Sequence, residues 1–296
     1  MRPTAPAPGW YDDPWAPGWV RWWDGVQWTP HTSARPMYGE YLKQPMPLDG
    51  AVAAMKESDP QPWGWRPVGV PIIAYVVLIV TGQIVSRYWA PKHGTGERVF
   101  IVVANVVLEA ALAMAVYIAG RDVARRNGGW GNAFGLRWPR WSDAVPALAG
   151  FGAAFGARIF IGIVAALLTN GKAVTESQNL KTSGSVSAFA IVVLVVTAVI
   201  AAPIVEETVF RGLLLRTFLR RMSFWPAALL STAIFGLGHT YEVGTVAGAV
   251  TLALIVGSMG LVNCIVNRYT NRLSPGIFVH AMFNGLAILF LALGAA

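Results

Sequence analysis

Two adjacent carboxylates, Glu206 and Glu207, interrupt a long apolar run in the chain. A carboxylate inside a membrane is costly and by default marks a functional site with a partner. Arg211 follows Glu207 by four residues, so on a helix the two side chains share a face and can neutralise each other. A carboxylate withdrawn from water can act as a general base toward a water molecule. The competing interpretation is a helix that ends at residue 205, which would leave both carboxylates at the membrane surface without a function.

Two later apolar segments carry further polar groups that peptide hydrolysis needs. Phe235 and His239 are four residues apart, as are His280 and Asn284, so each helix can present its pair on one face. A histidine can hold the attacking water, and an imidazole or carboxamide donor can stabilise the tetrahedral oxyanion. A single histidine on an apolar helix is more often a packing residue. Together with the two carboxylates, however, these groups favour one shared site.

The three motifs resemble those of the CAAX-protease and bacteriocin-processing family, also called the Abi family, of intramembrane proteases. They are EExxxR at 206–211, FxxxH at 235–239 and HxxxN at 280–284. The likeness covers roughly residues 140–290. It implies an all-helical membrane core and endoproteolysis of a membrane-associated peptide or protein.

The resemblance also implies a role for each motif residue. Glu206 would be the base that activates water, with help from His239. His280 and Asn284 would form the oxyanion site. The pair of Glu207 with the arginine of the first motif would support them as an ion pair.

Zinc is an open question at this stage. Glu206, His239 and His280 could bind zinc in an open catalytic geometry, but the same residues explain hydrolysis without a metal. The chain also lacks the HExxH spacing of zinc proteases. We expect no tightly bound metal.

A second functional class competes with the peptidase. A non-proteolytic membrane scaffold, or a bacteriocin-immunity-type protein, could use the same polar cavity to bind a partner. Such a protein should tolerate the near-isosteric substitution Glu206→Gln, whereas a peptidase should not.

The elements that must position these residues are membrane helices. Of 296 residues, 55% are hydrophobic and 13% charged, about half the usual charged fraction. The single cysteine, Cys264, excludes an intramolecular disulfide. We therefore predict an all-α polytopic membrane protein with about seven spans of ~20 residues each. The expected spans are 68–89, 98–119, 144–168, 187–219, 224–240, 245–266 and 274–295.

Lysine and arginine residues predict the orientation, because they favour the cytoplasmic side of a membrane. Connections on one side carry seventeen of them and those on the other side five. We expect a multi-pass protein of the plasma membrane with a cytoplasmic N-terminus and an extracytoplasmic C-terminus. The net charge of +8 then reflects topology and contact with the lipid bilayer, not nucleic-acid binding.

The N-terminal region differs from the rest in composition. Six tryptophans lie among Gly, Pro and Asp within residues 9–32, a pattern typical of short strands separated by turns. We predict a small Trp-rich β module over 1–34, a linker over 35–66 and a transmembrane domain over 67–296. The module resembles a short domain of unknown function from actinobacterial membrane proteins. Its tryptophan cluster either binds a protein partner or is only a folding core.

One more charged pair falls within expected spans. Glu109 lies midway along the second span and Arg158 lies in the third, at similar estimated depths. We expect the two side chains to neutralise each other as a structural ion pair.

Overall fold

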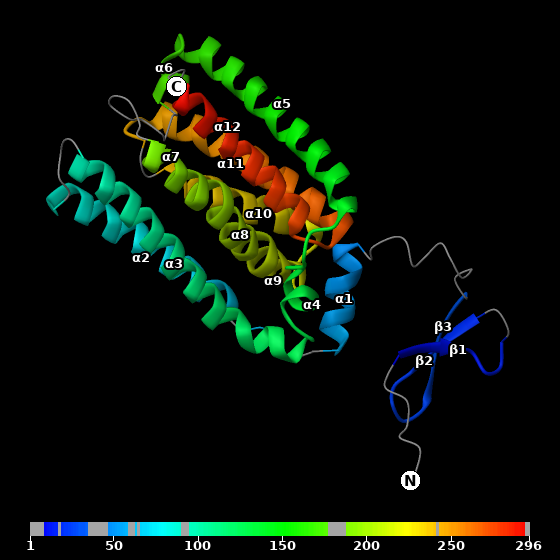
Figure 1. Cartoon of the computed structure of the whole chain (residues 1–296). Helices are drawn as coiled ribbons and strands as arrows, with labels where there is room; N and C mark the ends of the chain where they lie inside the picture. Colours follow the sequence, from blue (N-terminus) through cyan, green and yellow to red (C-terminus); the bar gives the residue numbers. More distant parts are fainter. Residues whose placement is uncertain are drawn as a thin grey trace. The chain divides into compact units, whose positions relative to one another are not determined.

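The computed structural model divides the chain into two units, residues 1–46 and 47–296 (Figure 1). The structure describes residues 9–16, 19–34, 47–58, 63, 66–89, 95–176, 188–240 and 243–293. Part of the expected linker, residues 35–46, lies outside these ranges.

The N-terminal unit contains a three-stranded antiparallel sheet in the order β1-β2-β3. Its strands are Gly9–Asp12, Trp19–Trp23 and Trp28–Ala34. The Trp28 ring meets the rings of Tyr11, Trp15 and Trp23 edge to face, with centroids 5.2–6.2 Å apart. Edge-to-face contacts suit the aromatic quadrupole, so one tryptophan joins all three strands and a turn. The predicted small β-rich module is confirmed.

An ion pair fixes the β1–β2 turn of this sheet. Arg21 Nη2 lies 2.9 Å from Asp13 Oδ2, and the Trp15 backbone N–H donates to Asp13 Oδ1 at 2.9 Å. Burial disfavours the ionised Asp13, but the hydrogen bonds from Arg21 and the Trp15 backbone outweigh it and lower the pKa of the carboxyl. Arg21 also lies over the Trp15 ring at 5.2 Å.

The expected linker is wrong for residues 48–58, which form helix α1, Leu48–Ser58. Leu48, Val52 and Met55 are buried at helical spacing, so the helix has one apolar face that packs on the helical unit. Arg268 donates to Asp49 Oδ2 from Nε at 3.1 Å and from Nη2 at 2.8 Å. Polar residues surround this short amphipathic pattern. The average composition of 35–66 therefore suggests a linker, although residues 48–58 have helical spacing.

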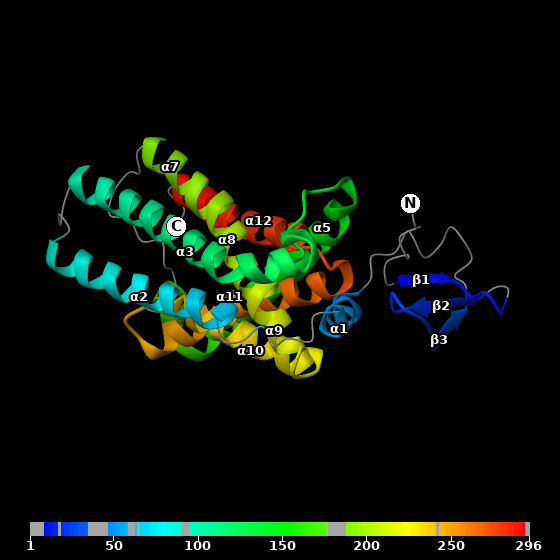
Figure 2. The same cartoon turned by 90° about the horizontal axis from the view of Figure 1, so that it is seen from below.

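Long helices form the rest of the second unit (Figures 1 and 2). They are α2 Arg66–Trp89, α3 Thr95–Arg126, α5 Ala144–Thr169, α10 Phe224–Leu237, α11 Val246–Thr270 and α12 Ser274–Ala292. Short segments connect them: α4 Trp130–Phe134, the 3₁₀ turn η1 Trp141–Asp143 and α6 Lys172–Glu176. Helix α11 packs against α5, α10 and α12, while α2 and α3 lie side by side.

The helix that carries the two carboxylates is continuous but not uniform. It consists of α7 Ala188–Leu194, the π-helical η2 Val195–Ala201, α8 Ala202–Glu207, the π-helical η3 Thr208–Leu214 and α9 Leu215–Leu219. Wide π turns occur often at functional sites. Pro203, which has no backbone N–H to donate, lies just after η2. The helix therefore continues well past residue 205, and the surface interpretation of Glu206 and Glu207 is wrong.

The prediction of seven spans is not confirmed. In the described ranges, three helices are long and apolar enough to cross a membrane: Trp141–Thr169, Ile191–Leu219 and Val246–Thr270. Three shorter apolar helices accompany them: Arg66–Gly82, Phe224–Leu237 and Ser274–Phe290. Helix α10 has 14 residues, about 21 Å at 1.5 Å per residue, against a hydrocarbon thickness of ~30 Å. Its expected range of 224–240 was too long.

Candidate active site

A buried ion pair forms the centre of the polar site. Arg211 Nη1 lies 3.0 Å from Glu207 Oε1, and the side chains are 0% and 1% exposed. Asn263 Nδ2 of α11 donates to the same oxygen at 2.8 Å and to the Gly276 carbonyl at 3.1 Å. A buried charge needs such a partner and further hydrogen bonds to be tolerated. The expected pairing of Glu207 with Arg211 is present.

Asn263 is a site residue that the sequence analysis missed. Asn263 links the carboxylate of Glu207, at the end of α8, to the backbone of Gly276 in the first turn of α12. Its signal in the sequence is an amide within the apolar run of α11, but nothing there indicates which helix it faces. The interaction needs the tertiary fold.

Glycine makes room for the arginine. A Cβ added to Gly260 would lie 2.7 Å from Arg211 Nη2 and 3.0 Å from the Phe235 ring. The Arg211 guanidinium lies over that ring, 4.5 Å from its centroid, in a cation–π arrangement. The aromatic residue of the second motif therefore supports the arginine of the first.

Glu206 faces both histidines. His239 Nε2 lies 3.7 Å and His280 Nε2 3.8 Å from Glu206 Oε2. Glu206 is 7% exposed, and its Oε2 is buried without a hydrogen-bond partner. These separations exceed a direct hydrogen bond, so neither imidazole satisfies Glu206 Oε2 directly.

The backbone sets the orientation of His239. Helix α10 ends at Leu237, and His239 Nδ1 lies 2.8 Å from the Phe235 carbonyl oxygen. A carbonyl oxygen only accepts, so Nδ1 donates to it, and in a neutral ring Nε2 is then the acceptor. That nitrogen is on the side of Glu206.

His280 contacts both carboxylates. Besides the Nε2 contact with Glu206, its Nδ1 lies 3.3 Å from Glu207 Oε1, and the side chain is 3% exposed. Its ring also meets the Phe235 ring edge to face at 5.8 Å. The imidazole therefore lies between the two carboxylates.

Asn284 donates to a backbone carbonyl outside the three motifs. Its Nδ2 donates to the Ala198 carbonyl of η2 at 2.8 Å, so the amide joins α12 to the π-helical turn before the carboxylates. The structure therefore brings together Glu206, Glu207, Arg211, His239 and His280, while Asn284 borders this group through η2.

The donor set does not form a metal group in this arrangement. In the described part of the chain, no three or more His, Cys, Asp or Glu side chains are placed to hold a metal ion. Tetrahedral zinc with bonds of ~2.1 Å would bring its ligand atoms to about 3.4 Å from one another. The Glu206–histidine separations of 3.7 and 3.8 Å are wider.

The expected pairing of Glu109 with Arg158 is wrong. The Arg158 guanidinium lies over the Phe283 ring, 5.3 Å from its centroid. Glu109 Oε2 is buried without a hydrogen-bond partner, and its carboxylate is close enough to Glu206 for the two charges to interact. Similar depth along two helices does not ensure that the side chains face each other.

Comparison with known proteins agrees with the motifs. Residues 188–286 match the family described as type II CAAX prenyl endopeptidase Rce1-like, and residues 8–39 match the protein of unknown function family DUF2510. The "Putative membrane peptidase YdiL" of Bacillus subtilis (strain 168) is 26% identical over 100 residues. This match covers 34% of the chain and 38% of that relative. No solved structure matches the chain significantly.

The chain is thus a membrane protein whose residues 188–286 are similar to the CAAX endopeptidase family. The predicted resemblance is confirmed for residues 188–286, a range that contains all three motifs. The N-terminal likeness to a domain of unknown function is confirmed for residues 8–39. Glu109 lies outside the matched segment, although its helix contacts α8.

Proposed function

We propose that the protein is an intramembrane endopeptidase that hydrolyses a peptide bond of a membrane-associated peptide or protein. The observation that carries this proposal is the buried, unpartnered Oε2 of Glu206 with two imidazole nitrogens 3.7 and 3.8 Å away. A buried polar atom without a partner is costly. Water at this position would satisfy it and would be held ready for attack.

In the proposed reaction, Glu206 is the general base. The water donates one hydrogen bond to Glu206 and the other to the Nε2 lone pair of His239. In this orientation a lone pair of the water oxygen points toward the substrate carbonyl carbon. Glu206 takes a proton as the new C–O bond forms, and then gives that proton to the amine nitrogen as the C–N bond breaks.

The oxyanion of the tetrahedral intermediate needs a donor. His280 supplies an N–H from Nε2, while its Nδ1 lies 3.3 Å from the Glu207 carboxylate. Asn284 uses one N–H on the Ala198 carbonyl and keeps a second N–H for the same oxyanion. Arg211 balances the charge of Glu207, so that the Glu206 carboxylate is the one left to react.

The proposed topology keeps seven spans in the plasma membrane. The short α10 then ends within the hydrocarbon region, where an irregular backbone is tolerated only next to protein or a water-filled cavity. His239 would lie at that end, where water could hydrogen-bond to the backbone groups that the helix leaves unpaired. The bias of seventeen positive residues to five supports a cytoplasmic N-terminus and an extracytoplasmic C-terminus.

The test compares wild-type protein with Glu206→Gln, matched for thermal stability, on a library of membrane-tethered peptides analysed by mass spectrometry. Glu109→Gln is the control, because it also neutralises a buried carboxylate near the site. We expect cleavage by the wild type and the control but none by Glu206→Gln. Equal cleavage by all three would contradict the proposal. No cleavage by any, with Glu206→Gln still complementing a deletion strain, would favour the scaffold.

The same assay tests the metal. The peptides are cleaved with and without a zinc chelator, and the zinc content of the purified protein is measured. We expect substoichiometric zinc and unchanged cleavage. Stoichiometric zinc whose removal abolishes cleavage would replace direct activation of water by Glu206 with a metal-dependent reaction.

A further inference from the structure

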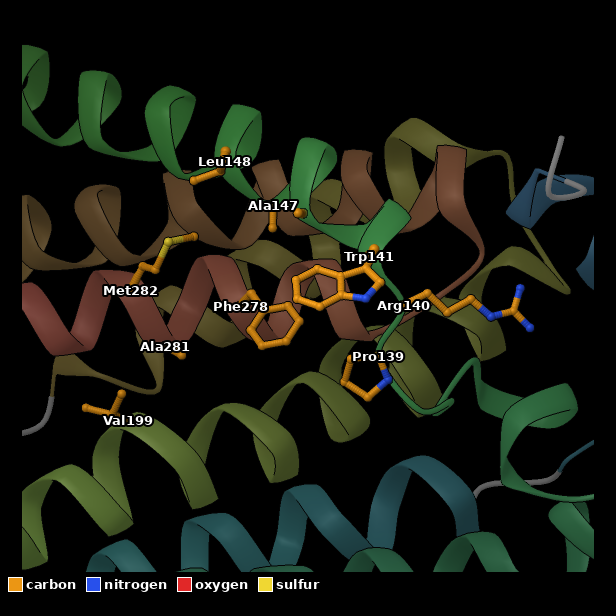
Figure 3. Close-up of a pocket in the computed structure, with 10 residues that line it drawn as sticks. Pro139, Arg140, Trp141, Ala147, Leu148, Val199, Phe278, Ala281 and Met282 are labelled. Carbon is orange, nitrogen blue, oxygen red and sulfur yellow. The ribbon is translucent and has the colours of Figure 1, made fainter. Parts of the chain in front are cut away.

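A cavity lies on the other side of α12 from the polar site. Its volume is about 720 Å³, within the range of small-molecule sites. Figure 3 shows Phe278, Ala281 and Met282 of α12 beside it, with Val199 of η2 and Trp141 of η1. Apolar side chains form nearly all of its lining.

The cavity is separate from the site of hydrolysis. Phe278 and Met282 are each two residues from His280, about 200° around the helix at 100° per residue. His280 is 2% exposed and faces Glu206 and Glu207. A ligand in the cavity would therefore contact the opposite face of the helix that carries His280.

One end of the cavity is positively charged. Arg140 lines it, and in Figure 3 the Arg140 side chain extends away from the apolar residues. Arg137 and Arg272 are near: burial, and then the charges of Arg272 and Arg140, lower the pKa of the Arg137 guanidinium. Asp143 is committed to Arg272, whose Nε lies 2.8 Å from its Oδ1. Within the described ranges, no carboxylate forms an ion pair with Arg140.

The same end carries exposed tryptophans. Trp138 is 91% and Trp141 97% exposed, and such residues concentrate at the level of lipid headgroups. Leu148, farther along the cavity rim, is 62% exposed. The cavity thus runs from a basic, aromatic end to an apolar end at the surface of the helical unit.

We infer that this cavity is a binding site for an anionic phospholipid, with an acyl chain along α12 and the phosphate at Arg140. The apolar lining suits a hydrocarbon chain, which a soluble anion would not use. The excess of arginine over free carboxylate selects a negative headgroup over a zwitterionic one. This inference does not depend on proteolytic activity.

The test measures lipid retention by the full-length protein in detergent. Native mass spectrometry compares phosphatidylglycerol with phosphatidylcholine of identical acyl chains, added in equal amounts. We expect one phosphatidylglycerol per chain and a clear preference for it. Arg140→Gln should reduce this preference about fivefold, since an arginine near an anionic lipid surface contributes ~1 kcal/mol. Arg221→Gln, which removes another exposed arginine, should leave it unchanged.

Two further variants test the cavity itself. Ala144→Phe and Ala281→Phe add a ring to its lining and should abolish retention of either lipid. Ala153→Phe adds the same ring at an exposed position of α5 outside the lining and should have no effect. Equal retention of both lipids by the wild type, or undiminished retention by both filled variants, would overturn the inference.

Discussion

His239 Nδ1 lies 2.8 Å from the carbonyl oxygen of Phe235, one turn earlier in the chain. This contact directs Nε2 toward Glu206 and leaves it as an acceptor. A glutamine at position 239 lacks the ring nitrogen that the Phe235 carbonyl holds, so its acceptor oxygen would not be fixed toward Glu206 and the proposed water would lose a preorganised acceptor.

His239→Gln should lower kcat for peptide cleavage by 10²- to 10⁴-fold, the usual contribution of a group that assists proton transfer. The side chain is 19% exposed, so thermal stability should change little. Initial-rate kinetics and a thermal unfolding scan measure the two effects. Thr240→Ser, at the adjacent, half-buried position, is the control. A His239→Gln enzyme with wild-type kcat would remove His239 from the reaction.

The Glu207–Arg211 ion pair should contribute to the free energy of unfolding. Arg211→Met leaves the Glu207 carboxylate buried without its cation, which should cost about 3–5 kcal/mol of unfolding free energy. The double variant with Glu207→Gln removes both charges and should recover much of that loss. A double-mutant cycle in detergent measures the coupling. Additive effects of the two substitutions would contradict a direct interaction.

Gly260 provides a steric test of the same region. Gly260→Ala would place a methyl group 2.7 Å from Arg211 Nη2 and 3.0 Å from the Phe235 ring, so the guanidinium must shift. We expect a loss of about 1–3 kcal/mol, as for other overpacked sites, together with reduced activity. Gly152→Ala is the matched control, because a Cβ there meets nothing within 4 Å. Equal stability of the two variants would show that the packing adapts.

The N-terminal sheet should lose stability in acid. The folded-state pKa of Asp13 is lowered, so its contribution is present above the unfolded value of about 3.9. That contribution is lost as the pH falls through the lower, folded-state pKa. Fluorine NMR of the full chain labelled with fluorotryptophan can follow unfolding of the sheet. Asp13→Asn should be less stable at neutral pH and show a weaker dependence below pH 4. The same acid dependence in both proteins would assign it elsewhere, for example to Asp24, whose pKa is also lowered.

Spacing along single helices was the most reliable guide to this site. Glu207 with Arg211, and Phe235 with His239, are partners one turn apart, and local helical geometry alone brings them together. Spacing along one helix could not predict which residues of different helices contact each other. Asn263 contacts Glu207 across 56 positions, and Asn284 donates to Ala198 rather than toward Glu206. Their partners depend on how each helix is rotated, which polarity and length do not determine.

Helix α1 was also missed from the sequence, within the polar stretch that was expected to be a linker. Its three buried side chains form a short pattern that composition averages out. The failed pairing of Glu109 with Arg158 has a similar cause, because depth fixes the height of a residue along a helix but not its direction.

The two π-helical segments on either side of α8 also have a consequence for the register of that helix. A π turn takes about one residue more than an α turn, and one residue corresponds to about 100° of rotation. The phase of the helix therefore changes before Glu206 and again before Arg216, which is fully buried and donates to Asn271 at 2.7 Å. Deleting one residue from η3 would turn α9 and carry Arg216 away from Asn271, whereas a substitution at the same place would not. Length in this stretch should therefore be far less variable than composition, and a relative with one residue fewer here would have a differently oriented inner face.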